Sequence, residues 1–273
     1  MAIIHDFHMH SSFSSDSSAT MESMIQSALD KKLAGICFTE HYDINYPELS
    51  SEGTPLFVPD FDAYRANYLE SADKYQEKIH VSFGIELGLQ PHLAEQYYKC
   101  IKTYPFDFVI GSIHNCNGKD PYHTDIFFKG LTEEEGYRKY FQFVLESLNA
   151  YDGFDSLGHL DYVIRYGPNK DKYYSYDKYK DVLDPILIKL ISMGKALECN
   201  TGALSRGLQN TNPGSDVIKR YRELGGELVT IGSDAHKPES VSADFAFARS
   251  VLLESGFTHY ATFHQRIPQL HKL

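Results

Sequence analysis

Short runs of β-branched and aromatic residues alternate with longer amphipathic stretches along the whole of this 273-residue chain. This alternation is typical of repeated β-α units around a parallel sheet. A chain of this length can bury a sizeable apolar core as one barrel or one sandwich. No low-complexity tract or charge block marks a linker. We therefore predict an α/β fold with residues 1–273 in a single domain.

The candidate strands and helices follow one another along the chain. Thr132 and Glu135 form a capping box at one helix start, and Asn212 before Pro213 marks another. Pro185 lies inside a helical stretch, where its missing N–H predicts a break. The long connections 42–60 and 115–131 are expected to cover a substrate. Strands are expected at 3–8, 35–41, 80–87, 107–114, 156–161, 196–201 and 228–234, and helices near 20–33, 61–77, 92–103, 133–150, 176–192, 214–224 and 243–254.

Composition narrows the class of protein. No apolar run approaches the roughly 20 residues that span a bilayer, and the first residues lack the basic start and apolar run of a secretory signal. We expect no membrane association and a place in the cytoplasm. The four cysteines are scattered without a C-x-x-C pair, so neither a disulfide framework nor a thiolate zinc site is predicted. A net charge of -11 weighs against nucleic-acid binding and favours a small substrate.

Histidine, aspartate and glutamate gather where the predicted strands end. The carboxyl ends of parallel barrel strands meet at one face, where active sites are built. Alternate strand residues point the same way, so two ligands separated by one residue can bind one ion. A lone strand histidine is more often structural, but six at the ends of five strands predict a metal centre. The residues concerned are His8, His10, Glu40, His41, Glu86, His114, His159, Asp161, Asp234 and His236.

The type of ligand points to the chemistry. Imidazole and carboxylate groups without thiolate suit zinc, iron or manganese, and the sequence leaves that choice open. A cluster of ions serves displacement at phosphorus, because it stabilises both the attacking hydroxide and the charge on the phosphoryl oxygens. We therefore expect two or three divalent ions and metal-activated attack of hydroxide on a phosphate ester.

Six short motifs extend this argument to a family. They are HMHS at 8–11, TEH at 39–41, GIELG at 84–88, GSIH at 111–114, GHLD at 158–161 and SDAH at 233–236. With these motifs, in this order and over almost its full length, the chain resembles the polymerase and histidinol phosphatase (PHP) family. The resemblance implies a distorted seven-stranded (β/α)7 TIM-like barrel with a trinuclear metal centre.

The resemblance also implies a distribution of ligands. The third-ion position taken here by Asp16 is often histidine in relatives, but aspartate is also a competent ligand. The first ion would be held by His8, His10, Glu86 and Asp234, the second by Glu86 as a bridge with His114 and His159, and the third by Asp16, His41 and His236.

Within the family, the chain looks most like the stand-alone histidinol-phosphate phosphatases. That likeness implies hydrolysis of L-histidinol phosphate to L-histidinol and phosphate in histidine biosynthesis. The alternatives are a PHP-type phosphoesterase acting on nucleotides or other small phosphomonoesters, a phosphotyrosine phosphatase, and a non-catalytic metal-binding scaffold. The scaffold is disfavoured because all nine ligand positions are filled. The oligomeric state is left open.

Several residues outside the ligand set are candidates for contact with the substrate. Arg165 and Arg206 follow predicted strands in loops of the active face, and the guanidinium fork suits phosphate oxygens. Asp161 is expected to orient a ligand or to protonate the leaving alkoxide, and the first role is favoured. Asn115 and His123 are candidates for substrate contacts, and Asn200 is a further candidate for a hydrogen bond.

Overall fold

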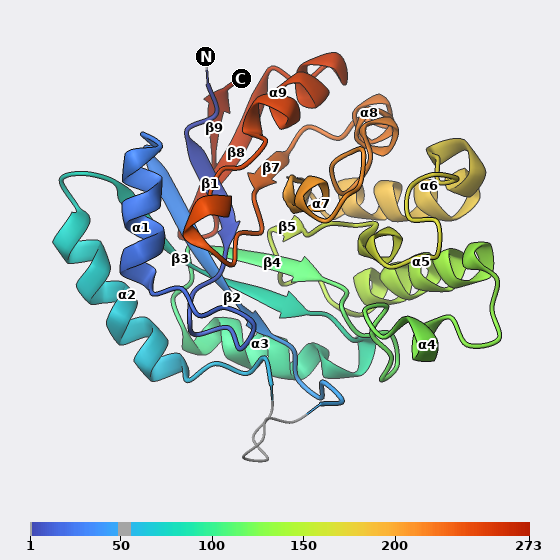
Figure 1. The fold of residues 1–273 in the computed structure, drawn as a ribbon, viewed down its shortest axis with the longest axis horizontal. Coiled ribbons are helices and arrows are strands. Elements are labelled where there is room, and N and C mark those ends of the chain that lie inside the picture. Colours follow the sequence, from blue (N-terminus) through green and yellow to red (C-terminus); the bar gives the residue numbers. More distant parts are fainter. Residues whose placement is uncertain (1, 49–55) are drawn as a thin grey trace.

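The structure, a computed structural model, describes residues 2–48 and 56–273. Its centre is a parallel sheet with its strands in chain order. Hydrogen bonds of 2.8 Å from His10 N to Ala235 O and from Asp234 N to His8 O join the ends of the two edge strands, so the sheet nearly closes into a barrel (Figure 1). The strands are β1 (His5–Met9), β2 (Gly35–Tyr42), β3 (His80–Gly88), β4 (Phe108–Ser112), β5 (Ser156–Leu157), β6 (Ala196–Asn200) and β7 (Val229–Gly232).

Helices form an outer layer around this barrel (Figure 1). The longer ones are α1 (Met21–Asp30), α2 (Phe61–Tyr75), α3 (Ala94–Thr103), α5 (Glu133–Ala150), α6 (Tyr176–Ser192), α8 (Ser215–Glu223) and α9 (Phe245–Glu254). Short helical turns at Pro91–Leu93, Thr124–Phe127 (α4), Tyr162–Arg165, Gly202–Ser205 (α7) and Pro238–Ser240 lie in the connections. The seven-stranded barrel predicted from the sequence is confirmed.

The sequence made three local predictions about helices, of which one is confirmed and two are wrong. The capping box of Thr132 and Glu135 is present at the start of α5. The break at Pro185 is wrong, because α6 continues through it. Leu183, Ile186 and Leu187 beside that proline are fully buried, and this packing stabilises the helix despite one missing hydrogen bond.

The helix start predicted at Asn212 is also wrong. Gly214 precedes α8, and no side chain caps this helix. The Asn212 side chain instead donates to Asp161 Oδ1 at 2.6 Å and accepts from Arg165 Nε at 2.7 Å. Its polar groups therefore serve a buried hydrogen-bond network rather than a helix end.

A hairpin that the sequence did not predict closes the amino-terminal end of the barrel. It consists of the antiparallel strands β8 (His259–His264) and β9 (Ile267–Lys272), and β9 lies beside β1 in Figure 1. Phe263 stacks on Phe108, with ring centroids 5.1 Å apart, and Phe108 contacts Phe7. The hairpin therefore plugs the end of the barrel opposite the predicted active face.

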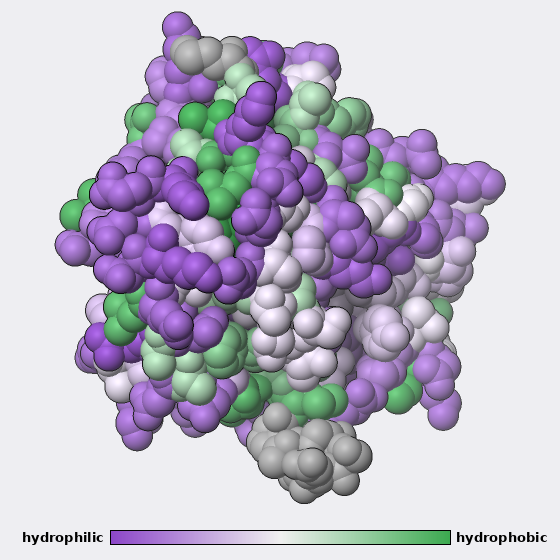
Figure 2. All heavy atoms as spheres, turned by 60° about the vertical axis from the view of Figure 1, so that its left-hand side comes forward, coloured by the Kyte–Doolittle hydropathy of each residue, from purple (hydrophilic) through white to green (hydrophobic). Residues whose placement is uncertain are grey.

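The face of the protein shown in Figure 2 is mainly polar. Figure 2 shows hydrophilic side chains over most of one face, with hydrophobic side chains in small separate groups. Among the described residues, no helix combines the length and the apolar character needed to cross a bilayer.

Candidate metal centre

The first group of predicted ligands lies where β1 meets β7. His8 and His10 are fully buried and point to the same side of β1, with ring centroids 5.3 Å apart. Their Nε2 atoms lie 3.8 and 3.7 Å from Asp234 Oδ1. Asp234 follows β7 with a left-handed backbone, φ 54°, a conformation that costs energy and is common at functional sites. These three side chains form one potential ion site.

Glu86 on β3 lies at the middle of the cluster. Its Oε2 is 3.3 Å from His8 Nε2 and 3.0 Å from His41 Nδ1. Its Oε1 is 2.9 Å from His159 Nε2 and 3.4 Å from His114 Nε2. One carboxylate therefore faces two groups of imidazoles, which is the arrangement a bridging ligand needs.

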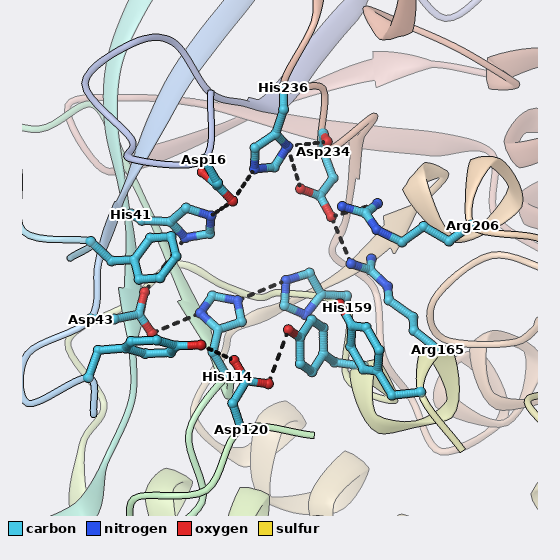
Figure 3. A pocket seen from close by; sticks show the side chains of 14 residues that line it. Asp16, His41, Asp43, His114, Asp120, His159, Arg165, Arg206, Asp234 and His236 are labelled. Carbon is cyan, nitrogen blue, oxygen red and sulfur yellow. Dashed lines mark hydrogen bonds and ion pairs between the residues drawn. The ribbon is translucent and has the colours of Figure 1, made fainter. Parts of the chain in front are cut away.

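The third group involves Asp16, which the family resemblance brought into the ligand set. Asp16 Oδ2 lies 3.1 Å from His236 Nε2 and 3.5 Å from His41 Nε2 (Figure 3). The rings of His41 and His236 each stack on His10 at 4.2 Å between centroids. The third group thus adjoins the first through His10.

The cluster meets a physical test for cations. His8 Nε2, His10 Nε2, His41 Nδ1 and Glu86 Oε2 are buried and have no hydrogen-bond partner. Buried polar atoms are normally paired, because leaving one unpaired costs about 1 to 3 kcal/mol. Coordination to divalent ions would satisfy these atoms together. Four sets of three ligand atoms lie within 4.8 Å of one another, and all draw on these residues.

The ionisable side chains of the cluster shift one another's pKa values. Burial raises the pKa of Glu86, but His8, His114 and His41 outweigh it and hold that pKa well below its usual value. The pKa of Asp234 is likewise low, because Arg206, Arg165 and His8 outweigh burial. Burial, followed by the neighbours His41 and His236, lowers the pKa of His10. Ionised carboxylates and a neutral imidazole are the forms that bind metal.

Glu198 on β6 is a functional candidate that the sequence analysis missed. Its Oε1 contacts His8 Nδ1 at 2.5 Å, and its Oε2 accepts from His159 N at 2.7 Å. A Cβ at Gly232 would lie 2.6 Å from Glu198 Oε1 and 2.2 Å from His8 Cβ, so only glycine fits there. Glu198 therefore orients two predicted ligands. Its sequence signal was a glutamate between the apolar residues Leu197 and Cys199 of a buried strand.

Asp43 and Glu40 orient further ligands. Asp43 Oδ1 lies 2.9 Å from His114 Nδ1, and this close approach needs Gly88, where a Cβ would lie 1.8 Å from the same oxygen. Glu40 accepts from the hydroxyl of Ser14 at 2.5 Å, and that hydroxyl lies 3.1 Å from His10 Nδ1. Glu40 therefore supports His10 through the Ser14 hydroxyl and does not itself belong to the ligand set.

A cavity of about 450 Å³ opens over the cluster (Figure 3). His41, His114, His159, Asp234 and His236 form its floor, and Arg165 and Arg206 stand together on one wall. The remaining lining residues are Asp16, Asp43, Tyr46, Phe57, Asp120, Tyr162 and Tyr166. The cavity is therefore cationic on one wall and aromatic with buried carboxylates on another.

The two arginines differ in how tightly they are held. Arg165 is buried and donates to Asn212 Oδ1, Asp234 Oδ2 and Asn200 Oδ1 at 2.7, 3.0 and 3.0 Å. Arg206 is more exposed; its Nη1 donates to Gly202 O at 3.1 Å and lies 3.6 Å from Asp234 Oδ2. Arg206 therefore has more donors free for a ligand.

The structure places four other candidates outside the cavity lining, namely Asp161, Asn115, His123 and Asn200. The Asp161 carboxylate accepts from Asn212 Nδ2 and from Gly214 N at 3.1 Å, and burial raises its pKa to about 7. Asp161 is buried and does not line the cavity, so its position does not favour the proton-donor role, which stays a prediction. Asp161 instead positions Asn212, which contacts Arg165.

Asn115 and His123 are likewise absent from the cavity wall. Asn115 Nδ2 donates to Asn45 O at 3.5 Å, and His123 Nε2 lies 3.0 Å from Glu48 Oε1. Both side chains are turned toward the connection after β2. Direct substrate contact from either is therefore not supported by their positions.

Comparison with known proteins gives a consistent picture. Residues 6–202 match the PHP domain. A probable histidinol-phosphatase of Clostridium acetobutylicum is 36% identical over 89% of this chain and 90% of its own length. The histidinol-phosphatase of Lactococcus lactis is 32% identical over 94% of this chain and 93% of its own. A crystal structure of the Lactococcus lactis histidinol phosphate phosphatase with zinc, L-histidinol and phosphate superposes with a TM-score of 0.87, at 30% identity and covering 97% of this chain and 98% of that one.

Proposed function

The chain belongs to the PHP domain family, and from this premise we propose its function. It is a metal-dependent phosphomonoesterase that hydrolyses L-histidinol phosphate to L-histidinol and phosphate. The observation that carries this function is the set of unpartnered imidazole nitrogens around Glu86, facing two arginines across one cavity. Relatives with the same activity, aligned over nearly the whole chain, support the substrate. The cytoplasmic location stays a prediction.

The proposed ligand set follows the three groups of side chains. His8, His10, Glu86 and Asp234 hold the first ion, Glu86 with His114 and His159 the second, and Asp16, His41 and His236 the third. When bound, divalent ions supply positive charge to the phosphoryl oxygens and activate a water at neutral pH. Zinc is supported by the bound zinc of the Lactococcus lactis enzyme; iron and manganese stay open.

Residues of the chain itself bind the phosphoryl group and orient the metal ligands. Arg206 and Arg165 bind the phosphoryl oxygens from the wall opposite His41 and His114, and their fixed charge stabilises the charge that develops there. Glu198 holds the His8 ring so that Nε2, rather than Nδ1, faces the ion. The surrounding imidazoles hold the pKa of Glu86 well below its usual value, and bound cations would favour the ionised carboxylate in their place.

The wall around Asp120 is proposed to bind the organic part of the substrate. The Asp120 carboxylate is buried and accepts from Tyr46 Oη at 2.8 Å and from Tyr162 Oη at 3.4 Å. A carboxylate among aromatic rings suits a cationic amine or an imidazole. L-Histidinol carries both groups, whereas a simple aryl phosphate carries neither.

The test compares kcat/KM for L-histidinol phosphate, nucleotides, phosphotyrosine and a generic aryl phosphate, using metal-replete protein. A preference of several hundredfold for histidinol phosphate is expected, and Asp120→Asn should reduce it mainly by lowering kcat/KM for that substrate. Asp125→Asn, which changes an exposed aspartate on α4, is the matched control. A flat profile, or a preference for nucleotides, would keep the metal centre and overturn the substrate assignment.

A further inference from the structure

Four histidines surround a second hollow at the end of the barrel away from the metal centre. They are His5 on β1, His80 at the start of β3, His264 at the end of β8 and His271 on β9. The hollow measures about 610 Å³ and is also lined by Thr262 and Phe263. None of these residues has a part in the hydrolysis described above. We call the four side chains the basal histidine cluster.

The barrel register brings the first two histidines to one level. His5 pairs with Gly35 on the next strand, and Gly35 pairs with His80 on the strand after it. A Cβ at Gly35 would lie 2.9 Å from His5 Cδ2 and 3.6 Å from His80 Cβ. The His5 ring therefore leans across the glycine toward His80, into space that any other residue would fill.

The carboxy-terminal hairpin brings the other two. The ring of His271 lies 4.1 Å from that of His5, between centroids, and the ring of His264 lies 5.9 Å from that of His80. Imidazoles from both ends of the sequence thus line one hollow. The segments that they come from are β1, β3 and the β8–β9 hairpin.

Three of the rings have one nitrogen fixed by a neighbour and the other free. His5 Nδ1 contacts Tyr260 Oη at 2.7 Å, and His271 Nε2 contacts Thr262 Oγ1 at 2.7 Å. His264 Nδ1 lies 3.1 Å from Asp107 Oδ1. Histidines that bind metal are oriented in the same way, with the second nitrogen held by a carboxylate or another polar group. His5 Nε2, His271 Nδ1 and His264 Nε2 are left for a ligand.

The protonation state also suits an ion. Burial, and then the neighbouring His271 and His80, lower the pKa of His5 to about 4, and burial lowers the pKa of His271. Both rings are therefore neutral at pH 7, the form that coordinates metal. Within the described part of the chain, each set of three ligand atoms that converges within 4.8 Å belongs to the metal centre. The basal histidine cluster therefore needs a rotation of its side chains before three of its nitrogens can bind one ion. His80 and His264 are exposed and can turn toward the partly buried His5 and His271 at low cost.

We propose that the basal histidine cluster is an accessory binding site for a late first-row divalent ion such as Ni²⁺, Cu²⁺ or Zn²⁺, for which imidazole is a favoured ligand. The bound ion would tie β1 and β3 to the carboxy-terminal hairpin. Because this site exists only in the folded chain, the ion would also raise the unfolding temperature.

The test uses tag-free holoenzyme with its active-site ions already bound. The protein is dialysed against micromolar Ni²⁺, and nickel and the original metal are counted per chain. We expect one additional nickel per chain without loss of the original metal, together with a higher unfolding temperature. His80→Ala/His264→Ala should lose both effects and keep phosphatase activity. His92→Ala/His259→Ala, which changes two exposed histidines outside the hollow, should behave as the wild type.

Three results would overturn the proposal. They are the absence of additional nickel, nickel that enters only by displacing the original metal, and additional nickel that His80→Ala/His264→Ala still binds. Should that variant fold poorly, electron paramagnetic resonance of Cu²⁺ added to the wild-type holoenzyme gives an independent readout. Nitrogen couplings from two or more imidazoles are expected while the active-site metal is retained, and their absence counts against the site.

Discussion

Glu198→Gln tests whether a buried carboxylate behind the metal centre controls the ions in front of it. The wild-type carboxylate contacts His8 Nδ1 and accepts from His159 N and from Asn200 Nδ2, at 2.5, 2.7 and 3.1 Å. A glutamine has only one acceptor oxygen. If this oxygen keeps the two nitrogen donors, the amide NH₂ meets His8 Nδ1–H, and two donors then face each other. His8 must rotate or move its proton to Nε2, the atom that faces the ion.

The expected magnitude follows from that conflict. Loss of a partner that orients a metal ligand typically costs 10- to 100-fold in metal affinity or activity, which is about 1.4 to 2.8 kcal/mol. Because the glutamine oxygen keeps His159 N, the effect arises at His8 alone, and we expect a loss within this range. The fold should persist, since glutamine has the same shape and keeps two of the three contacts.

The assay is a titration of metal-depleted protein with Zn²⁺ or Mn²⁺, followed by phosphate release from L-histidinol phosphate. Glu198→Gln should need 10- to 100-fold more metal for half-maximal activity, while circular dichroism and the unfolding temperature of the apoprotein stay near wild type. Glu254→Gln, at an exposed position on α9, is the control. A wild-type metal requirement in folded Glu198→Gln would refute the argument that Glu198 sets the His8 tautomer.

The remaining predictions concern the barrel rim, the arginine wall and the barrel base. Gly88→Ala would place a Cβ 1.8 Å from Asp43 Oδ1, so kcat/KM should fall about 10- to 100-fold as the carboxylate leaves His114; unchanged kinetics would show that His114 needs no such partner. Arg206→Ala should raise KM for histidinol phosphate with little change in urea unfolding, whereas Arg165→Ala leaves buried partners unpaired and should also cost about 3 to 5 kcal/mol of stability. Equal stability of the two variants would contradict this difference. The pKa of His5 falls from its ordinary value of 6.5 to about 4 in the folded protein, because the ring is partly buried beside His271 and His80. The unfolded chain therefore binds that proton more tightly, and stability is lost as the pH drops through this window. Since the ring is only half-buried, His5→Gln should reduce the loss between pH 7 and pH 5 by about 1 kcal/mol in urea unfolding; an identical pH dependence in both proteins would exclude this contribution.

The rim of the barrel was predictable because its signals are local in sequence. His8 and His10 are separated by one residue, and an extended segment turns such a pair to the same side. Asp234 and His236 have the same spacing, but Asp234 has a left-handed backbone, so here the extended geometry expected from the spacing is absent. Their position at strand ends then follows from the α/β alternation. Asp16 carries no such signal, since it lies in an irregular loop between β1 and α1. Only the family resemblance brought it to His41 and His236.

Other features depend on contacts distant in sequence. The β8–β9 hairpin turns through Gln265 and Arg266, both with positive φ, where a hairpin signal would normally be Asn-Gly. Glu198 on β6 gains its role from its contact with His8 on β1. These two strands come close only because β7, which lies between them, joins β1 where the barrel closes. The spacing of His159 and Asp161 predicts that they share one side of an extended segment, but β5 ends at Leu157, and the Asp161 carboxylate accepts from Asn212 and Gly214 outside the cavity lining.

Asp234 couples the two halves of the catalytic cavity, and this limits what a substitution there can reveal. Its Oδ1 faces His8 and His10 at 3.8 and 3.7 Å, while its Oδ2 accepts from Arg165 at 3.0 Å and lies 3.6 Å from Arg206. Removing this carboxylate would take away a proposed metal ligand and release two guanidinium groups at the same time. Loss of activity in such a variant would therefore combine weaker metal binding with altered phosphate binding. Arg206→Ala separates the effect on phosphate binding from the effect on metal binding. Arg206 contacts the metal centre through Asp234, and its removal leaves the imidazole ligands in place.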